Sequence, residues 1–169
     1  MKKKLIRHLT DNFIISDENE FQSLNSKGFG IKSDNIFILN EYEAAYLLEK
    51  NKIEITNSKL KPVTKEEIIS RKNFNLNKYI VFKDLQRKGY NVKTANKYGF
   101  DFRIYPKGKK EGEEHSIWLL DIINEEQKIS MKYFSGKARI AHSTNKNVIL
   151  AIIDDQKSIN YIEFKWIRP

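Results

Sequence analysis

The run Val148–Ile153, which reads VILAII, is the feature that most limits the folds open to this chain. Its six consecutive apolar residues are largely β-branched, which favours a strand, and they leave no polar side to face water. Such a strand belongs inside a sheet that is covered on both faces. We therefore predict a central strand in a sheet packed against helices.

The elements predicted around this run give the second half of the chain a clear order. A helix is expected after Asn75, with an apolar face that includes Tyr79 and Phe82, and Gly89 fits the position that follows its last turn. Ser130 is placed to cap a second helix that runs to about Ser143. Strands are expected at 90–94, 101–105, 116–123 and 159–166. The order is helix, three strands, helix, two strands, which is typical of an α/β or α+β fold.

The first half predicts a smaller mixed arrangement of short strands and helices. Strands are expected at Phe13–Ile15, Ile36–Leu39 and Ile53–Ile55, a glycine-marked turn at 27–30, a helix over Glu41–Lys50 after Asn40, and another helix opened by the capping-box pattern Thr64–Glu67. Apolar periodicity lapses near residues 72–77. We expect an N-terminal mixed α/β domain over residues 1–74 and a second domain over residues 75–169, whose central mixed sheet is flanked by helices.

Composition excludes several classes of protein. The 169 residues include no Cys, which rules out disulfides, Cys-ligated metal centres and a thiol nucleophile. No apolar run approaches the length that a membrane-spanning helix needs. The beginning, MKKKLIRHLTDNF, is charged like a signal peptide, but Arg7, His8 and Asp11 interrupt its apolar stretch. We expect a cytoplasmic protein.

An excess of positive charge suggests a polyanionic partner, nucleic acid above all. The net charge is +9, and it is unevenly distributed: residues 1–75 hold 13 basic and 11 acidic side chains, whereas residues 76–169 hold 18 and 11. If a phosphate backbone is bound, this favours the second half as the surface. A basic, merely soluble protein is the alternative that charge alone leaves open.

The three histidines differ in their surroundings. His8 lies in a polar segment, where we expect it to be exposed and inert, and His142 lies near the end of a predicted helix, where an imidazolium complements the helix dipole. His115 follows a hydrophilic loop and directly precedes an apolar strand. A side chain at such a junction is held in place yet faces solvent, and an imidazole can act as an acid or a base near neutral pH.

Two further residues could join His115 at one end of the sheet. Tyr105 ends the preceding predicted strand, and Lys146 begins the apolar one. Around one phosphate of RNA, these three groups could act as a ribonuclease that needs no metal. The 2′-hydroxyl would be the nucleophile, one group would take its proton, one would protonate the leaving 5′-oxygen, and a cation would stabilise the phosphorane.

A metal-dependent nuclease is the competing reading. Such sites use a carboxylate together with an Asp/Glu-x-Lys triplet on a strand, and Glu163-Phe164-Lys165 has that form, as does Glu126-Gln127-Lys128. In a chain with 31% charged residues these triplets also arise as ordinary solvated surface.

Several stretches of the chain match one known family: YIVFKDLQRKGYNVKT at 79–94, KYGFDFRIYP at 97–106, EHS at 114–116, RIAHS at 139–143 with Lys146, GFG at 28–30 and EAAYLL at 43–48. Through them the sequence resembles, over most of its length, the archaeal tRNA-splicing endonuclease family. The resemblance implies an enzyme that cuts precursor tRNA at a bulge-helix-bulge without a metal or other cofactor. The products would carry 2′,3′-cyclic phosphate and 5′-hydroxyl ends.

The resemblance also implies roles for individual residues. Tyr105 matches the family's general base, His115 its general acid and Lys146 its transition-state stabiliser. A tyrosine base is chemically demanding, because a free phenol has a pKa of about 10, and a neighbouring cation such as Lys146 would lower it. Arg139 matches one of the arginines that sandwich a flipped base of the RNA.

Assembly is the last implication of the resemblance. Family members work as four-unit enzymes in which an acidic loop docks into a neighbour, and Asp154 and Asp155 match that loop, although pattern alone favours an ordinary turn there. Trp166 and Ile167 beside the final strand would add dimer area. The sequence fits a homotetramer, a dimer of dimers or the catalytic half of a heterotetramer. A non-catalytic RNA-binding subunit is the rival function, which the presence of all three candidate catalytic residues disfavours.

Overall fold

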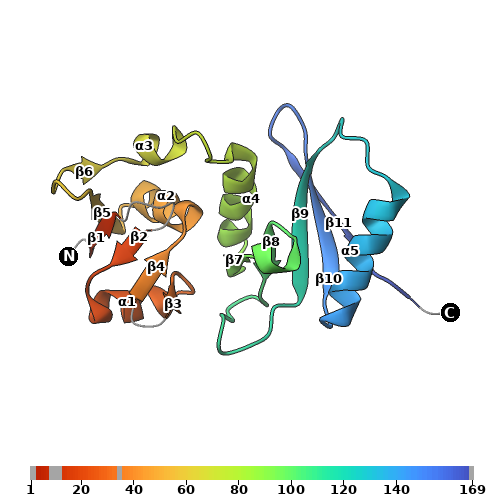
Figure 1. The fold of residues 1–169 in the computed structure, drawn as a ribbon, viewed down its shortest axis with the longest axis horizontal. Helices are drawn as coiled ribbons and strands as arrows, with labels where there is room; N and C mark the ends of the chain where they lie inside the picture. Colours follow the sequence, from red (N-terminus) through yellow and green to blue (C-terminus); the bar gives the residue numbers. More distant parts are fainter. Residues whose placement is uncertain (1–2, 8–12, 34–35, 168–169) are drawn as a thin grey trace. The chain divides into compact units, whose positions relative to one another are not determined.

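The structure is a computed structural model, and it describes residues 3–7, 13–33 and 36–167. The chain separates into two compact units, Met1–Leu76 and Asn77–Pro169, each of which is described by itself (Figure 1). Within the described ranges, no helix is both long enough and apolar enough to cross a membrane.

A six-stranded sheet forms the body of the first unit. Its strand order is β3 (Ile31–Ser33), β4 (Ile36–Leu39), β2 (Phe13–Ile15), β1 (Lys3–Arg7), β5 (Ile53–Thr56) and β6 (Pro62–Val63). The β1–β5 pair is parallel and the other pairs are antiparallel. The predicted strands β2, β4 and β5 are confirmed, whereas β1, β3 and β6 were not predicted.

Side-chain caps begin the three helices of this unit, α1 (Glu18–Asn25), α2 (Glu41–Glu49) and α3 (Lys65–Ile69). Asn40 and Glu43 form a reciprocal capping box at α2, with N···O distances of 2.9 and 3.1 Å. Thr64 and Glu67 do the same at α3. These contacts satisfy backbone N–H groups that a helix start leaves unpaired, so both predicted helix starts are confirmed. α1 was not predicted.

The predicted glycine turn before β3 is also confirmed, and Gly30 shows why glycine is needed there. Its φ of +76° is unfavourable for other residues, and a Cβ atom at this position would lie 3.2 Å from the carbonyl oxygen of Ile38. The Gly30 N–H donates to Oε1 of Glu43, which is 2% exposed. The turn is thereby tied to the first turn of α2.

The second unit contains the mixed sheet that the apolar run predicts. Its strand order is β11 (Ile159–Phe164), β10 (Asn147–Ile153), β9 (Trp118–Asn124), β8 (Phe102–Ile104) and β7 (Val92–Thr94). The neighbouring strands β9 and β10 are parallel, and the other pairs are antiparallel. β10, which holds the VILAII run, therefore has a partner strand on each side.

Helices cover both faces of this sheet (Figure 1). α4 (Leu76–Arg87) packs on one face, where the rings of Phe82 and Phe102 lie 6.2 Å apart. α5 (Met131–Ser143) packs on the other, where Ala141 joins a buried cluster with Leu119 and Val148. Ser130 caps α5 through the N–H of Tyr133, as predicted. The predicted fold class, a small mixed domain followed by a mixed sheet flanked by helices, is confirmed.

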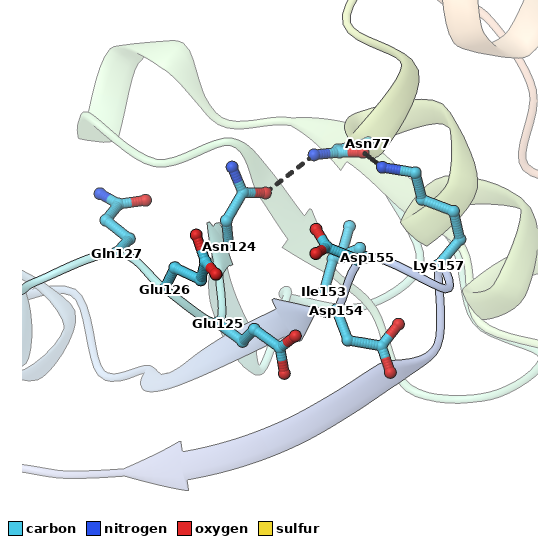
Figure 2. Close-up of a pocket in the computed structure, with 9 residues that line it drawn as sticks. All are labelled: Asn77, Asn124, Glu125, Glu126, Gln127, Ile153, Asp154, Asp155 and Lys157. Atoms are coloured by element: carbon cyan, nitrogen blue, oxygen red, sulfur yellow. Dashed lines mark hydrogen bonds between the residues drawn. The ribbon is translucent and has the colours of Figure 1, made fainter.

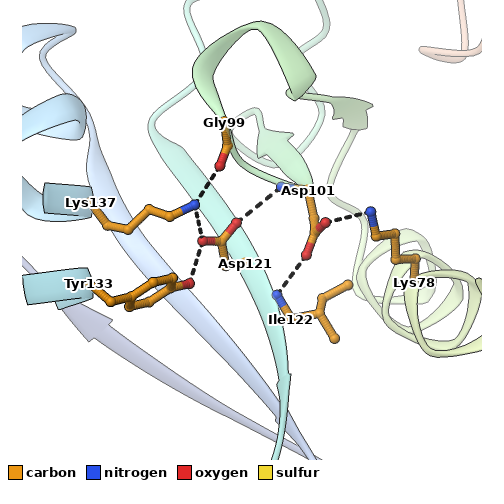
Figure 3. A network of polar contacts seen from close by, with 7 residues as sticks. All are labelled: Lys78, Gly99, Asp101, Asp121, Ile122, Tyr133 and Lys137. Atoms are coloured by element: carbon orange, nitrogen blue, oxygen red, sulfur yellow. Dashed lines mark hydrogen bonds and ion pairs between the residues drawn. The ribbon is translucent and has the colours of Figure 1, made fainter. Parts of the chain in front are cut away.

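A buried polar network fixes α5 against the sheet (Figure 3). Asp121 of β9 is 6% exposed and accepts hydrogen bonds from the Tyr133 hydroxyl and the Lys137 ammonium, both on α5. It also accepts from the backbone N–H of Asp101, whose own carboxylate accepts from Lys78 of α4 at 2.6 Å. Burial, and then the hydrogen bond to Asp121, raise the pKa of Tyr133, so that its hydroxyl stays a donor. The network joins both helices to the sheet.

Candidate active site

The register of three strands defines one edge of the second unit's sheet. Ile104 of β8 pairs with Trp118 of β9, and Trp118 pairs with Asn147 of β10. These residues form one row across the sheet, since paired residues lie side by side. Tyr105 directly follows the row, Lys146 directly precedes it, and His115 lies three residues before it. We call this the starting edge, because β9 and β10 both begin there.

Tyr105 is fixed in place at this edge. Its backbone N–H donates to the carbonyl of Asn91 at 3.0 Å, and its side chain is buried, with 3% exposed. Burial raises its pKa to about 12, while the charge of Arg103 acts in the opposite direction. The phenol is therefore overwhelmingly protonated at neutral pH.

His115 lies on the loop that connects β8 to β9. The loop closes where the N–H of Ile117 donates to the carbonyl of Ile104 at 2.9 Å, and Ser116 between them is buried. The His115 side chain itself is exposed. This matches the predicted loop–strand junction, where a backbone that is hydrogen-bonded to β8 carries a side chain that solvent can reach.

Lys146 is held by the end of α5. Its N–H donates to the carbonyl of Ala141 at 2.8 Å, and its ammonium donates to the carbonyl of Thr144 at 3.0 Å. Carbonyl groups at a helix C-terminus carry partial negative charge, which favours a cation there. Between the helix and β10, Asn145 takes a φ of +55°, a conformation that asparagine tolerates well. The short turn therefore presents Lys146 at the starting edge.

A surface hollow adjoins Lys146. It is lined by Ile117, His142, Asn145, Lys146 and Asn147. His142 is exposed at the last turn of α5, and its ring lies 4.7 Å from that of Trp166. The hollow thus combines two cationic or titratable side chains with amide groups, a set that suits a phosphate.

Glu163 has a structural environment that sequence reasoning missed. Its Oε1 accepts from the indole N–H of Trp118 at 2.9 Å and from the side-chain amide of Asn147 at 2.7 Å. The carboxylate therefore ties β9, β10 and β11 together next to Lys146. The spacing of these residues in the sequence gives no sign of the contact, because it depends on strand register. Within the ranges that the structure describes, no three His, Asp or Glu side chains are grouped so as to hold a metal ion.

The other candidate residues, for RNA binding and for assembly, lie away from the starting edge. Arg139 is exposed on α5, one turn before His142. Asp154 and Asp155 lie at the opposite end of β10, in the turn to β11, where Asp154 Oδ1 accepts from the N–H of Ser158 at 2.7 Å. His8 lies outside the described residues.

The turn that holds the two aspartates borders an acidic pocket (Figure 2). Glu125 and Glu126 follow β9 and face the same pocket as Asp154 and Asp155. Asn77 donates to Asn124 at 3.0 Å and accepts from Lys157 at 3.3 Å across its rim. We call this the finishing edge. The structure thus brings Tyr105, His115 and Lys146 to one edge of the sheet and the aspartates to the other.

Comparison with known proteins gives consistent matches over nearly the whole chain. Residues 75–161 match the family model described as tRNA intron endonuclease, catalytic C-terminal domain, and residues 7–69 match the one described as tRNA intron endonuclease, N-terminal domain. A tRNA-splicing endonuclease of Thermococcus kodakarensis is 36% identical over 94% of this chain and 95% of its own length. Those of Pyrococcus abyssi and Methanothermobacter thermautotrophicus are 34% identical over 99% of both chains and 40% identical over 78% of both.

Proposed function

Because the chain belongs to the tRNA intron endonuclease family and is an endonuclease of tRNA splicing, we propose that it excises introns by cutting bulge-helix-bulge RNA without a metal ion. The observation that carries the proposal is the row Ile104–Trp118–Asn147, which sets a phenol, an imidazole and an ammonium at one sheet edge. Those groups suffice for phosphoryl transfer within RNA.

The proposed reaction uses the RNA's own nucleophile. The 2′-oxygen forms a bond to the adjacent phosphorus while the bond from phosphorus to the 5′-oxygen breaks. Tyr105 takes the 2′-hydroxyl proton and His115 gives a proton to the leaving 5′-oxygen. Lys146 neutralises the charge that develops on the phosphorane oxygens. The products carry a 2′,3′-cyclic phosphate and a 5′-hydroxyl.

Each assignment draws on the local environment of its residue. His115 is exposed and can meet an RNA phosphate, whereas the Lys146 ammonium is already oriented by the carbonyl of Thr144. Tyr105 presents the more demanding case. With a pKa raised to about 12 by burial, its ionised fraction at neutral pH depends on the cations around the phenol.

The contacts of Glu163 support the metal-free route. Its carboxylate oxygen is engaged by two neutral donors, Trp118 and Asn147, and so serves to join strands. Lys165, the other half of the Glu-x-Lys triplet, is exposed two residues further along. This environment fits the second interpretation of the triplet, in which Glu163 and Lys165 are part of an ordinary solvated surface rather than a metal site.

RNA binding and assembly complete the proposal. Arg139 is exposed on α5, where its guanidinium can stack on a flipped base. Asp154 and Asp155 would dock into a neighbouring copy, in a homotetramer, a dimer of dimers or a complex with a second subunit type. With precursor tRNA as its substrate, the protein would work in the cytoplasm.

The decisive experiment is cleavage of a model bulge-helix-bulge RNA by the purified chain in excess EDTA, with analysis of the product ends. We expect cyclic-phosphate and 5′-hydroxyl ends, and the same RNA with a 2′-deoxy residue at the cut site should resist. Loss of cleavage in EDTA with recovery in Mg²⁺ would overturn the metal-free mechanism. The variant Glu163→Gln separates the two routes further, because a metal ligand would be essential and a strand contact would not.

A further inference from the structure

Arg103 lies against the ring of Tyr105. The two residues are separated by one position on and just after β8, so alternation places their side chains on the same face of the sheet. The guanidinium carbon is 5.8 Å from the centroid of the Tyr105 ring, within the range of a cation–π contact. The Arg103 side chain is 15% exposed, so that water screens its charge only partly.

Glu111, on the loop between β8 and β9, holds the outer end of Arg103. The Glu111 carboxylate lies 2.6 Å from a terminal guanidinium nitrogen, and its own side chain is 39% exposed. The inner nitrogen, Nε, is buried and has no hydrogen-bond partner among the described residues. An unsatisfied buried donor is costly, so the position of this guanidinium is not explained by hydrogen bonding alone.

The charged and titratable groups around the phenol come from several elements. Arg103 lies on β8, Glu111 on the loop, and Tyr98 on the 3-10 helix Asn96–Tyr98. Lys93 of β7 pairs with Arg103 in the sheet, and His115 and Lys146 share the starting edge. Burial is the largest influence on the pKa of Tyr105 and raises it, Arg103 lowers it, and Glu111 and Tyr98 raise it.

We propose that Arg103 is a positioning residue for Tyr105, whose guanidinium favours the ionised phenol, and that Glu111 restrains it through their ion pair. The proposal rests on the proposed role of Tyr105 as the general base. Arg103 supplies positive charge beside a buried phenol, and the loop carboxylate offsets part of it. The loop that bears His115 therefore also bears Glu111, whose carboxylate influences how easily the Tyr105 phenol ionises.

This arrangement predicts opposite effects for the two members of one ion pair. Removing the cation disfavours the phenolate, so Arg103→Met raises the pKa of Tyr105. Removing the anion favours the phenolate, so Glu111→Gln lowers it. If the pair only held the loop in place, losing either member would damage the site in the same direction.

The test is a titration of Tyr105 by NMR in protein labelled with ¹³C at the tyrosine ζ carbon, with Tyr105→Phe identifying its signal. We expect the Tyr105 signal to ionise at lower pH in Glu111→Gln and at higher pH in Arg103→Met, with Arg103→Lys restoring most of the original behaviour. Glu113→Gln is the matched control, because Glu113 pairs with Lys110 at 3.4 Å on the same loop, and it should leave the titration unchanged.

Single-turnover cleavage at one pH supplies the second readout. Each pKa unit changes the phenolate fraction about ten-fold, so Arg103→Met should be slower by roughly that factor and Glu111→Gln faster by several-fold. Shifts of equal sign in both variants, or none, would overturn the role of Arg103. If Tyr105→Phe cleaved RNA at the wild-type rate, the proposed role of Tyr105 as general base would be overturned instead. The NMR titration of the wild type and the Arg103 variants would still report whether Arg103 acts on the phenol.

Discussion

The two edges of the second unit's sheet carry different chemistry, although β9 and β10 contribute to both. At the starting edge of β9 and β10 stand Tyr105, His115 and Lys146, and at the finishing edge stand carboxylates that follow each strand. Parallel strands in register bring their first residues together and their last residues together. A parallel pair inside a mixed sheet can thus separate a site for an anion from an acidic surface.

The separation is large enough to keep the two edges electrostatically independent. Each strand has seven residues, which spans roughly 20 Å at the usual rise of a strand. Charges in solvent are largely screened beyond about 8 Å at physiological ionic strength. The carboxylates at one edge would therefore not repel an RNA phosphate bound, as proposed, at the other.

The largest expected effect tests the chemistry of the starting edge. His115→Ala should slow single-turnover cleavage about 10²- to 10⁴-fold, the range for loss of a general acid, while RNA binding changes little. Glu126→Gln at the finishing edge is the matched control and should leave the rate constant for cleavage unchanged. Equal losses of cleavage rate in the two variants would contradict the assignment of catalysis to the starting edge alone.

A second prediction concerns the middle of the sheet, which keeps the edges in place. Asp121→Asn removes the buried negative charge that Lys137 and Tyr133 contact, leaving a poorly paired ammonium. We expect a loss of roughly 3 kcal/mol in the free energy of unfolding, measured by urea denaturation. Glu125→Gln, a surface change, should cost almost nothing, and a similar cost for the two would contradict a structural role for the network.

The finishing edge is tested by the mass of the assembly. Asp155 is exposed, whereas Asp154 also caps its own turn, so Asp155→Asn is the cleaner change. If this edge docks into a neighbouring copy, the substitution should weaken self-association by roughly ten-fold, visible in sedimentation at moderate salt. Wild-type mass at every concentration would remove Asp155 from the proposed interface.

The smallest effect comes from a carboxylate that lies at neither edge. Asp84 of α4 accepts from Lys88 at 2.6 Å and from the Tyr161 hydroxyl at 2.8 Å. Burial tends to raise its pKa, but hydrogen bonds from Lys88, Tyr161 and Arg87 outweigh burial, and the pKa is lowered.

A lowered pKa in the folded state means that Asp84 stabilises the fold above its unfolded pKa, near 3.9, and that this stability is lost as pH falls. Asp84→Asn should lower Tm by on the order of 4 °C at pH 7. The difference between variant and wild type should shrink at pH 3. A difference independent of pH would show that charge plays no part in it.

Local sequence signals account for much of this fold. Helix caps are predictable because each is made by residues three positions apart, as at Asn40, Thr64 and Ser130. The VILAII run predicts β10 because it is apolar at every position. α1 had such a signal, since Asp17 accepts from the N–H of Glu20, but its mostly polar residues hide the apolar face. The β1–β5 pairing joins residues 50 apart, and nothing local predicts it.

The candidate site shows the same division. Local patterns predict that the three candidate catalytic residues lie at strand ends. The register of three strands then brings these ends, with Tyr105, His115 and Lys146, to the same edge of the sheet. The contacts that tune or hold them were not foreseeable. Arg103 meets Glu111 through the path of a loop, and Glu163 meets Asn147 across a strand pair. Such contacts depend on backbone geometry that residue types do not encode locally.

The anchoring of Lys146 has a consequence for how this protein tolerates mutation. Its backbone N–H and its ammonium donate to the backbone carbonyls of Ala141 and Thr144, and no side chain of the described part of the chain holds it. The residues of the final helical turn can therefore drift in identity while the lysine stays oriented, provided that the helix still stops at the same place. Insertions or deletions in that turn, by contrast, would move the carbonyls that orient Lys146. Evolutionary variation here should appear as substitutions of constant length.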